Sequence, residues 1–346
     1  MGHTRRLDEL GGADAGRYGG KSAGLGELLR AGIPVPPGFA VSTSAFHEFL
    51  EGSGLADRAA GALAGVSAGD VEALARAARV ITEGMRSAPV PDAVRTEVGV
   101  QYGGLPAGAG EDVPAVAVRS SALGEDSAEA TFAGQQETYL WVRGVDDICS
   151  AVRSCWASLY SAEAISYRAR LGGDAARRPA MGVTVQLMVD AAVSGVMFTC
   201  NPVSGDPSMV AIEASWGLGL AVVGGEVTPD DYLVSKVTCD VVREHVNDKV
   251  IEYLPAAGGR GAMRVPVGAE RRTARCLGGG EVAALVDVSK RIEGHFGSHQ
   301  DVEWAIDRGG TLYVLQSRPV TGLPPREPTS APASAMALVM KKFGAR

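Results

Sequence analysis

Acidic, amide and guanidinium side chains gather in one segment near the end of the sequence, residues 301–318. Asp301 and Glu303 stand at alternate positions of an otherwise apolar run, so in a strand both carboxylates would lie on one face. After a Gly-rich turn, a second run carries Gln316 and Arg318, again at alternate positions. Carboxylate and amide oxygens suit Mg²⁺, and a guanidinium can neutralise a phosphoryl group during transfer. The segment therefore predicts a hairpin that handles Mg²⁺ and phosphate.

Whether these four side chains share one face depends on the turn. With an even number of loop residues, Asp301 and Glu303 lie on the same face as Gln316 and Arg318. A three-residue loop would place the two pairs on opposite faces and remove the argument. The alternative interpretation is a surface hairpin that has one polar face and no chemistry.

A second candidate is the run Tyr18-Gly19-Gly20-Lys21-Ser22. It lacks P-loop spacing, because Ala15 stands where the first glycine is needed and no apolar strand precedes it. The glycine pair still lets backbone amides approach an anion. Lys21 would add a positive charge at the start of a helix predicted over 22–31, with Ser22 as its N-cap. The alternative is a surface turn with a solvated lysine.

The third candidate is Arg119, at the end of a strand-type run over 113–119. Ser120 and Ser121 follow, and a polar loop continues through Gln136. An arginine fork beside two hydroxyls is suited to clamp a phosphate. The alternative is an ordinary strand end with a polar loop.

Composition describes a globular protein of 346 residues, 46% hydrophobic and 21% charged. The net charge of -7 argues against a nucleic-acid partner, and no uncharged stretch is long enough to span a membrane. The N-terminus has no apolar signal region, and five cysteines without CxxC spacing favour reduced thiols. We therefore expect a cytoplasmic protein that has no nucleic-acid or membrane partner.

The order of the predicted elements gives an α+β class with two lobes. We expect a helix-rich N-terminal lobe over 1–180, a strand-rich lobe over 181–322, and a linker or tail over 323–346. Apolar periodicity predicts helices at 22–31, 43–50, 70–85, 146–171 and 281–295. Short apolar runs predict strands at 181–189, 195–199, 209–214, 232–237 and 241–246, before the hairpin.

Several short blocks occur in the order of a known family. They are Gly19-Gly20-Lys21-Ser22, Val118-Arg119-Ser120-Ser121, Phe132-Ala133-Gly134-Gln135, Trp216-Gly217-Leu218-Gly219, Asp301-Val302-Glu303-Trp304 and Gln316-Ser317-Arg318-Pro319. With them, residues 10–322 resemble the N-terminal ATP-binding domain shared by phosphoenolpyruvate synthase, pyruvate phosphate dikinase and rifampin phosphotransferase.

This resemblance implies an ATP-grasp fold with the nucleotide between two lobes, and ATP and Mg²⁺ as cofactors. It implies that Lys21 and Arg119 bind the phosphates, and that Glu303 and Gln316 bind Mg²⁺. Arg318 would stabilise the transferring phosphoryl group with support from Asp301. It also implies a phosphate loop formed by Thr131, Phe132, Ala133 and Gly134. Residues 184–189 would present their backbone to adenine, with Gln186 and Met188 beside the base.

Reactions of this family move the β-phosphate of ATP to a histidine on a mobile domain and release AMP and inorganic phosphate. No segment resembles the carrier's Thr-Ser-His run, so we expect a separate phosphohistidine carrier domain or subunit; the final acceptor stays open. Two alternatives remain: a free-standing ATP-grasp kinase or ligase that acts on a small molecule, and a nucleotide-binding protein without turnover. One departure is Leu220, which stands where the family usually has Glu.

Overall fold

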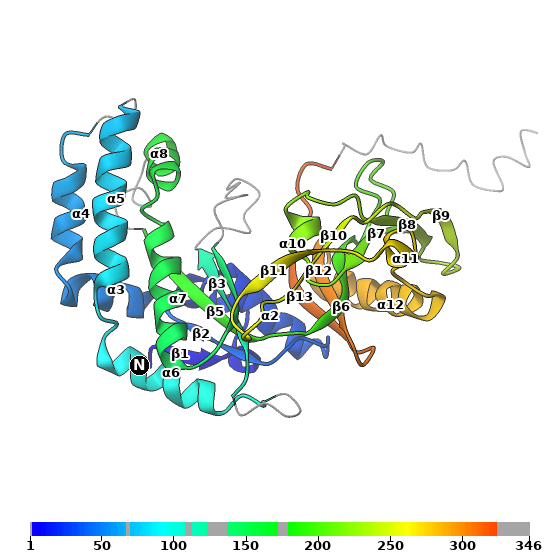
Figure 1. The fold of residues 1–346 in the computed structure, drawn as a ribbon, viewed down its shortest axis with the longest axis horizontal. Coiled ribbons are helices and arrows are strands. Elements are labelled where there is room, and N and C mark those ends of the chain that lie inside the picture. The colour runs from blue at the N-terminus through cyan, green and yellow to red at the C-terminus, as the bar shows by residue number, and fades with distance from the viewer. Residues whose placement is uncertain (1, 67–69, 108–112, 123–136, 172–178, 324–346) are drawn as a thin grey trace, which may run out of the picture.

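Two antiparallel sheets, each with its own helices, stand side by side in the molecule (Figure 1). The computed structural model describes residues 2–66, 70–107, 113–122, 137–171 and 179–323. We call the five-stranded sheet with its helices the first lobe, and the six-stranded sheet with its helices the second lobe. The predicted mixture of helix and sheet is confirmed. Over the described ranges, no helix combines the length and apolarity needed to cross a membrane.

The first lobe is built on a sheet with the strand order β1-β2-β5-β3-β4. Alternate residues of β5, such as Val183 and Val185, face an apolar core that includes Phe46, Phe49 and Trp156. Thr184 and Gln186 face the other way and are buried as well. The strands are β1 (Thr4–Arg6), β2 (Gly38–Val41), β3 (Val116–Ala122), β4 (Thr138–Val142) and β5 (Met181–Leu187). The helices are α3 (Thr43–Gly52), α4 (Leu55–Leu63), α5 (Val71–Ser87), α6 (Asp92–Gly103), α7 (Val145–Ser158) and α8 (Ala162–Leu171).

The second lobe has the strand order β13-β12-β6-β7-β8-β9. One sheet face packs on α12 (Gly279–Phe296) and α2 (Gly20–Arg30), and buries Val302 and Trp304. The alternate residues, Asp301 and Glu303, consequently lie on the opposite face. The strands are β6 (Ala191–Phe198), β7 (Met209–Trp216), β8 (Asp230–Ser235), β9 (Val241–His245), β12 (Gln300–Asp307) and β13 (Leu312–Pro319).

A separate hairpin, β10 (Ile251–Pro255) and β11 (Ala262–Pro266), connects the two lobes (Figure 1). At the middle of β10, the Tyr253 carbonyl accepts from the Leu218 amide at 3.0 Å. Its turn reaches the first lobe, where Arg260 lies 3.1 Å from Asp147 of α7. The remaining short elements are η1 (Leu7–Glu9), η2 (Gly12–Asp14), α1 (Ala15–Tyr18), α10 (Leu220–Val223) and α11 (Ala269–Arg272).

Two predicted helix features are wrong. Ser22 is not an N-cap, because α2 already begins at Gly20 and the Ser22 hydroxyl lies 2.7 Å from that of Thr184. The single helix predicted over 146–171 is two helices, α7 and α8. The Ser161 hydroxyl accepts the Ala164 amide at 3.1 Å and so starts α8 in the manner of an N-cap.

The segment after residue 180 does not belong wholly to the second sheet. β5 pairs with β2 and β3 in the first sheet, and the chain passes to β6 through Met188, Val189 and Asp190. Conversely, Leu25 and Leu28 of α2 pack in the core of the second lobe. The two lobes are therefore not two consecutive stretches of sequence. An early helix, α2, packs in the second lobe, and β5, which comes after residue 180, completes the first sheet.

Candidate functional site

Arg119 of β3 forms the junction between the two lobes. Its Nη2 donates to Glu303 Oε2 at 2.7 Å and to Gln316 Oε1 at 2.9 Å, and its Nη1 donates to the Leu315 carbonyl at 2.9 Å. The arginine side chain is 10% exposed. One guanidinium of the first lobe therefore gathers three oxygens of the β12–β13 hairpin.

The hairpin presents these oxygens because of a β-bulge. Asp301 pairs with Arg318 and Glu303 with Gln316, so the four predicted side chains do share a face. The turn nevertheless has an odd number of loop residues, which by itself would place the two pairs of side chains on opposite faces. The Asp307 amide donates to the Thr311 carbonyl at 3.0 Å, which leaves a three-residue loop. The register shifts by one residue between Glu303 and Trp304, and this bulge restores the shared face.

Lys21 lies at the start of α2, as predicted, but it is buried rather than solvated. Its Nζ donates to the Ser120 carbonyl at 2.8 Å, and the Ser22 amide donates to the Ser121 hydroxyl at 3.2 Å. Gly19 permits this close docking, because its φ is +84° and an added Cβ would meet the Ser121 carbonyl oxygen at 2.1 Å. The structure thus brings Lys21 to the end of β3, beside Arg119.

Arg318 has a different setting from Arg119. Its Nε and Nη2 lie 2.9 and 2.8 Å from Asp301 Oδ2, at the outer end of the hairpin. The Arg318 side chain is 46% exposed, whereas Asp301 is 15% exposed. Asp301 therefore orients a guanidinium that still has open access to solvent.

The charges of the site act on its carboxylates in opposite directions. Burial alone would raise the pKa of Glu303, but the charges of Arg119 and then Lys21 outweigh it and hold this pKa below its ordinary value. Burial raises the pKa of Asp301 above its ordinary value, although Arg318 opposes the shift. Glu303 is therefore the carboxylate of the pair that is held firmly ionised.

Glu303 and Gln316 fit a magnesium ion by their donor chemistry. Both side chains accept a hydrogen bond from the same nitrogen of Arg119, so the two oxygens lie close to each other. A carboxylate and an amide oxygen keep further lone pairs for a hard cation, which commonly retains several waters and phosphate ligands. Nowhere in the described ranges do three or more His, Cys, Asp or Glu residues form a metal-binding group.

The predicted adenine segment lies at the connection between the lobes. Gln186 is buried on the Arg119 face of the first sheet, with its Nε2 3.4 Å from the Pro36 carbonyl. The amides of Leu187 and Met188 donate to the Pro37 and Ala115 carbonyls, at 2.8 and 2.9 Å. These amides are therefore engaged by the protein's own backbone. Thr131, Phe132, Ala133 and Gly134 lie outside the described residues.

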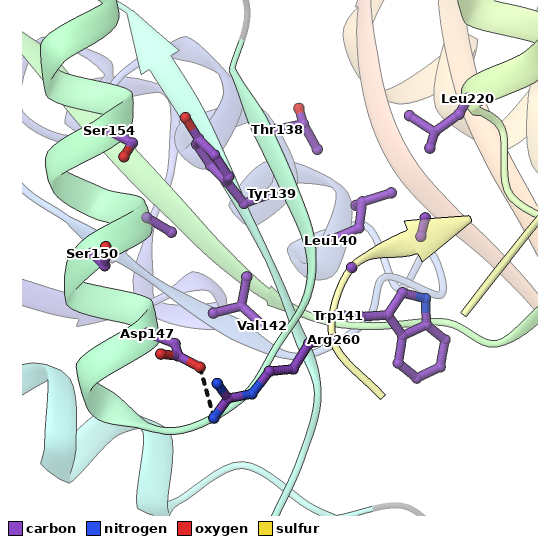
Figure 2. Close-up of a pocket in the computed structure, with 13 residues that line it drawn as sticks. Thr138, Tyr139, Leu140, Trp141, Val142, Asp147, Ser150, Ser154, Leu220 and Arg260 are labelled. Carbon is purple, nitrogen blue, oxygen red and sulfur yellow. Dashed lines mark ion pairs between the residues drawn. The ribbon is translucent and has the colours of Figure 1, made fainter. Parts of the chain in front are cut away.

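Strand β4 contributes residues next to the site that the sequence alone did not indicate. Thr138 pairs directly with Arg119, and the strand borders a cavity of about 490 Å³ that we call the β4 pocket. Figure 2 shows the pocket between β4, α7 and the turn of the β10–β11 hairpin, with Leu220 facing it from the second lobe. Its lining includes Thr138, Tyr139, Leu140, Trp141, Ser150, Ser154, Leu220 and Arg260. Only the apolar, aromatic-rich run that follows Thr138 could have indicated this strand.

The structure brings Arg119 and Lys21 together between two sheets, opposite a carboxylate and an amide of a hairpin. Such an arrangement is typical of proteins that bind anionic ligands such as nucleotide phosphates. Residues 15–337 match the family model for the pyruvate phosphate dikinase AMP/ATP-binding domain. The chain belongs to this family, and the resemblance inferred from its sequence blocks is confirmed.

Similar proteins carry phosphoenolpyruvate synthase names. A probable phosphoenolpyruvate synthase of Methanothermobacter thermautotrophicus is 44% identical over 317 residues, which cover 92% of this chain and 46% of that protein. One from Methanocaldococcus jannaschii is 40% identical over 92% of this chain and 26% of its own length. The phosphoenolpyruvate synthase of Pyrococcus furiosus is 38% identical over 92% and 43%. The chain thus spans less than half the length of these relatives.

Proposed function

We propose that this chain binds Mg-ATP between its two lobes and passes the β-phosphate to a histidine on a separate carrier domain or subunit. AMP and inorganic phosphate are the other products. The observation that carries the proposal is the Arg119 junction, in which one cation of the first lobe meets Glu303 and Gln316 of the second. Membership of the dikinase ATP-binding family and the names of the longer relatives support it.

Different residues of the chain bind the phosphates and stabilise the transfer. Lys21 and Arg119 supply fixed positive charge at the lobe junction, where a triphosphate would be held and oriented. Arg318, oriented by Asp301, meets the phosphoryl group as its charge redistributes during transfer. A bond forms between a histidine nitrogen and the β-phosphorus, and the bond from that phosphorus to the α-phosphate bridging oxygen breaks. The histidine then carries the β- and γ-phosphates together. Water attacks the γ-phosphorus, the bond from that phosphorus to the β–γ bridging oxygen breaks, and inorganic phosphate leaves the β-phosphoryl group on the histidine.

The proposal includes a magnesium ion beside the phosphates. Held by Glu303 and Gln316, Mg²⁺ would neutralise phosphate oxygens when bound. The adenine would lie near Gln186 and Met188, at the connection between the two lobes, and residues 131–134 would cover the phosphates. A cytoplasmic location agrees with the five cysteines, all of which are free thiols.

The test is an analysis of nucleotide products. The chain is incubated with Mg-ATP and with a histidine-carrier protein from the same organism as the phosphate acceptor, and the nucleotides are separated by chromatography. We expect AMP and inorganic phosphate in equal amounts, and dependence on the added acceptor. ADP as the nucleotide product would contradict the dikinase proposal and favour a kinase that acts directly on a small molecule.

A further inference from the structure

A second β-bulge redirects one side chain of β4. Arg119 pairs with Thr138 and Val118 with Tyr139, but the register shifts by one before Val116 pairs with Val142. The extra residue lies at Leu140 and Trp141, and Trp141 has a φ of +55°, which is rare for a bulky residue. Figure 2 shows the result: Tyr139 and Val142 point toward α7, whereas Leu140 and Trp141 both point toward the second lobe.

The redirected indole has a donor with no acceptor in the described part of the chain. Trp141 is 7% exposed, and its Nε1 has no hydrogen-bond partner there. The indoles of Trp156 and Trp304 share this property, but they lie in the closed cores of the two lobes. Trp141 is the one of the three that also lines the β4 pocket. A buried donor of this kind beside a cavity is suited to a ligand's acceptor.

Trp141 also lies where the two lobes meet the connection between them. It packs in a small apolar cluster with Val189 and Met188, which belong to the β5–β6 connection. The same cluster includes Leu315, whose carbonyl accepts from Arg119. The indole therefore belongs to the same apolar cluster as Leu315 of the phosphate-binding junction and as Met188 of the segment proposed for the base.

We propose that Trp141 is a specificity-determining residue for the nucleotide base. Its N–H donates to a ring nitrogen of the purine, and its ring packs against the base on the side of Met188. The strained backbone at the β4 bulge holds the indole toward the second lobe for this purpose. Arg143 lies with its guanidinium carbon 5.9 Å from the indole centroid and supports the ring's position. This inference rests on the proposed function, because it names the residue that reads the base of the same ATP.

The test pairs Trp141→Phe with purine analogues. We expect wild-type protein to bind Mg-ATP about three- to tenfold more tightly than Trp141→Phe, the effect of one hydrogen bond. Isothermal titration with 1-deaza-, 3-deaza- and 7-deaza-ATP identifies the acceptor. One analogue should bind wild-type protein more weakly by a similar factor, and should bind Trp141→Phe no more weakly than ATP does. Trp216→Phe is the matched control, since its N–H already donates to the Arg271 carbonyl at 2.9 Å.

A second variant separates folding from recognition. Trp141→Asn suits the positive φ and removes the indole, and a thermal melt checks that the variant is folded. Mg-ATP should change the tryptophan fluorescence of wild-type protein, and that change should be lost in Trp141→Asn. Wild-type affinity in Trp141→Phe, or equal losses for every analogue in both proteins, would overturn the inference alone. A wild-type protein that binds no Mg-ATP would overturn the proposed function as well.

Discussion

Arg119 and Arg318 lie against one face of the same hairpin, yet their surroundings differ. Arg119 comes from the first lobe and is nearly enclosed. It donates to oxygens of Glu303, Leu315 and Gln316 in β12 and β13. Arg318 belongs to the hairpin itself, contacts Asp301, and leaves almost half of its side chain in solvent. The enclosed arginine holds the lobes together before any ligand arrives. The exposed arginine is positioned to meet a reacting group.

This difference predicts different consequences for the same substitution. Groups that hold the resting structure contribute to stability and to ligand binding. Groups that interact more strongly with the transition state contribute to rate. Arg119 and Arg318 should therefore separate in experiments that measure stability, affinity and turnover independently.

The largest expected effect concerns the exposed arginine. We expect Arg318→Ala and Arg318→Lys to lower turnover by a factor of about one hundred or more, because the planar fork reaches two phosphate oxygens and an ammonium does not. The affinity for Mg-ATP should change far less. Single-turnover AMP release in the presence of the carrier measures the first quantity, and calorimetry measures the second.

The control for this prediction is another exposed arginine–aspartate pair. Arg6 lies 3.0 and 2.7 Å from the two Asp8 oxygens, and Arg6→Lys should leave turnover unchanged. Normal turnover in Arg318→Ala, together with an inactive Lys21→Ala, would mean that the hairpin is only structural.

Ligand stabilisation should distinguish the two arginines. Mg-ATP at a hundredfold excess over its Kd should stabilise wild-type protein by about 2.7 kcal/mol. The stabilisation should persist in Arg318→Ala and should largely disappear in Arg119→Ala at the same ligand concentration. Thermal melts with and without Mg-ATP test this, and the absence of any shift in wild-type protein would contradict nucleotide binding itself.

Without ligand, Arg119→Met should cost about 2 kcal/mol in the free energy of unfolding. A fully buried pair that loses one partner costs about 3–5 kcal/mol, and Glu303 is 28% exposed, so the cost should be lower. The double variant Arg119→Met/Glu303→Leu should regain part of the loss, since it leaves no uncompensated charge. Urea unfolding of the four proteins measures the coupling, and additive losses would argue against the pair.

The smallest effect concerns the turn that joins the lobes on their outer side. Asp147 and Arg260 form an exposed pair, so Asp147→Arg should cost less than about 1 kcal/mol. The reversed pair Asp147→Arg/Arg260→Asp should recover most of the loss in a thermal melt. A large effect on turnover from either single variant would show that this turn does more than tie the lobes together.

Local patterns in the sequence were sufficient for part of the site. Alternation placed Asp301 and Glu303 on one strand face and buried Trp304 on the other, and the Gly-Gly-Lys run placed Lys21 at the start of a helix. These features depend on periods of two residues or on the ends of one helix, which a short stretch of sequence contains.

The remaining features depend on pairing between distant segments. The bulges opposite Glu303 and near Trp141 insert one residue into a ladder, and no local pattern marks them. Arg119 finds its partners 184 and 197 residues further along the chain. The shared face of the hairpin was predicted on the condition of an even loop; the loop is odd, and the bulge compensates. Ser161 is a serine N-cap that was overlooked within an otherwise continuous helical pattern.

The most direct test of the proposed chemistry follows each phosphorus of ATP separately. The chain and the acceptor are incubated with Mg-ATP labelled at the β- or the γ-phosphorus, and the acceptor is isolated and tested for an acid-labile phosphohistidine. We predict β-label on the acceptor histidine and γ-label in inorganic phosphate, with the β-transfer slowed about one hundredfold or more in Arg318→Ala. γ-label on the acceptor, with ADP as the nucleotide product, would contradict this account.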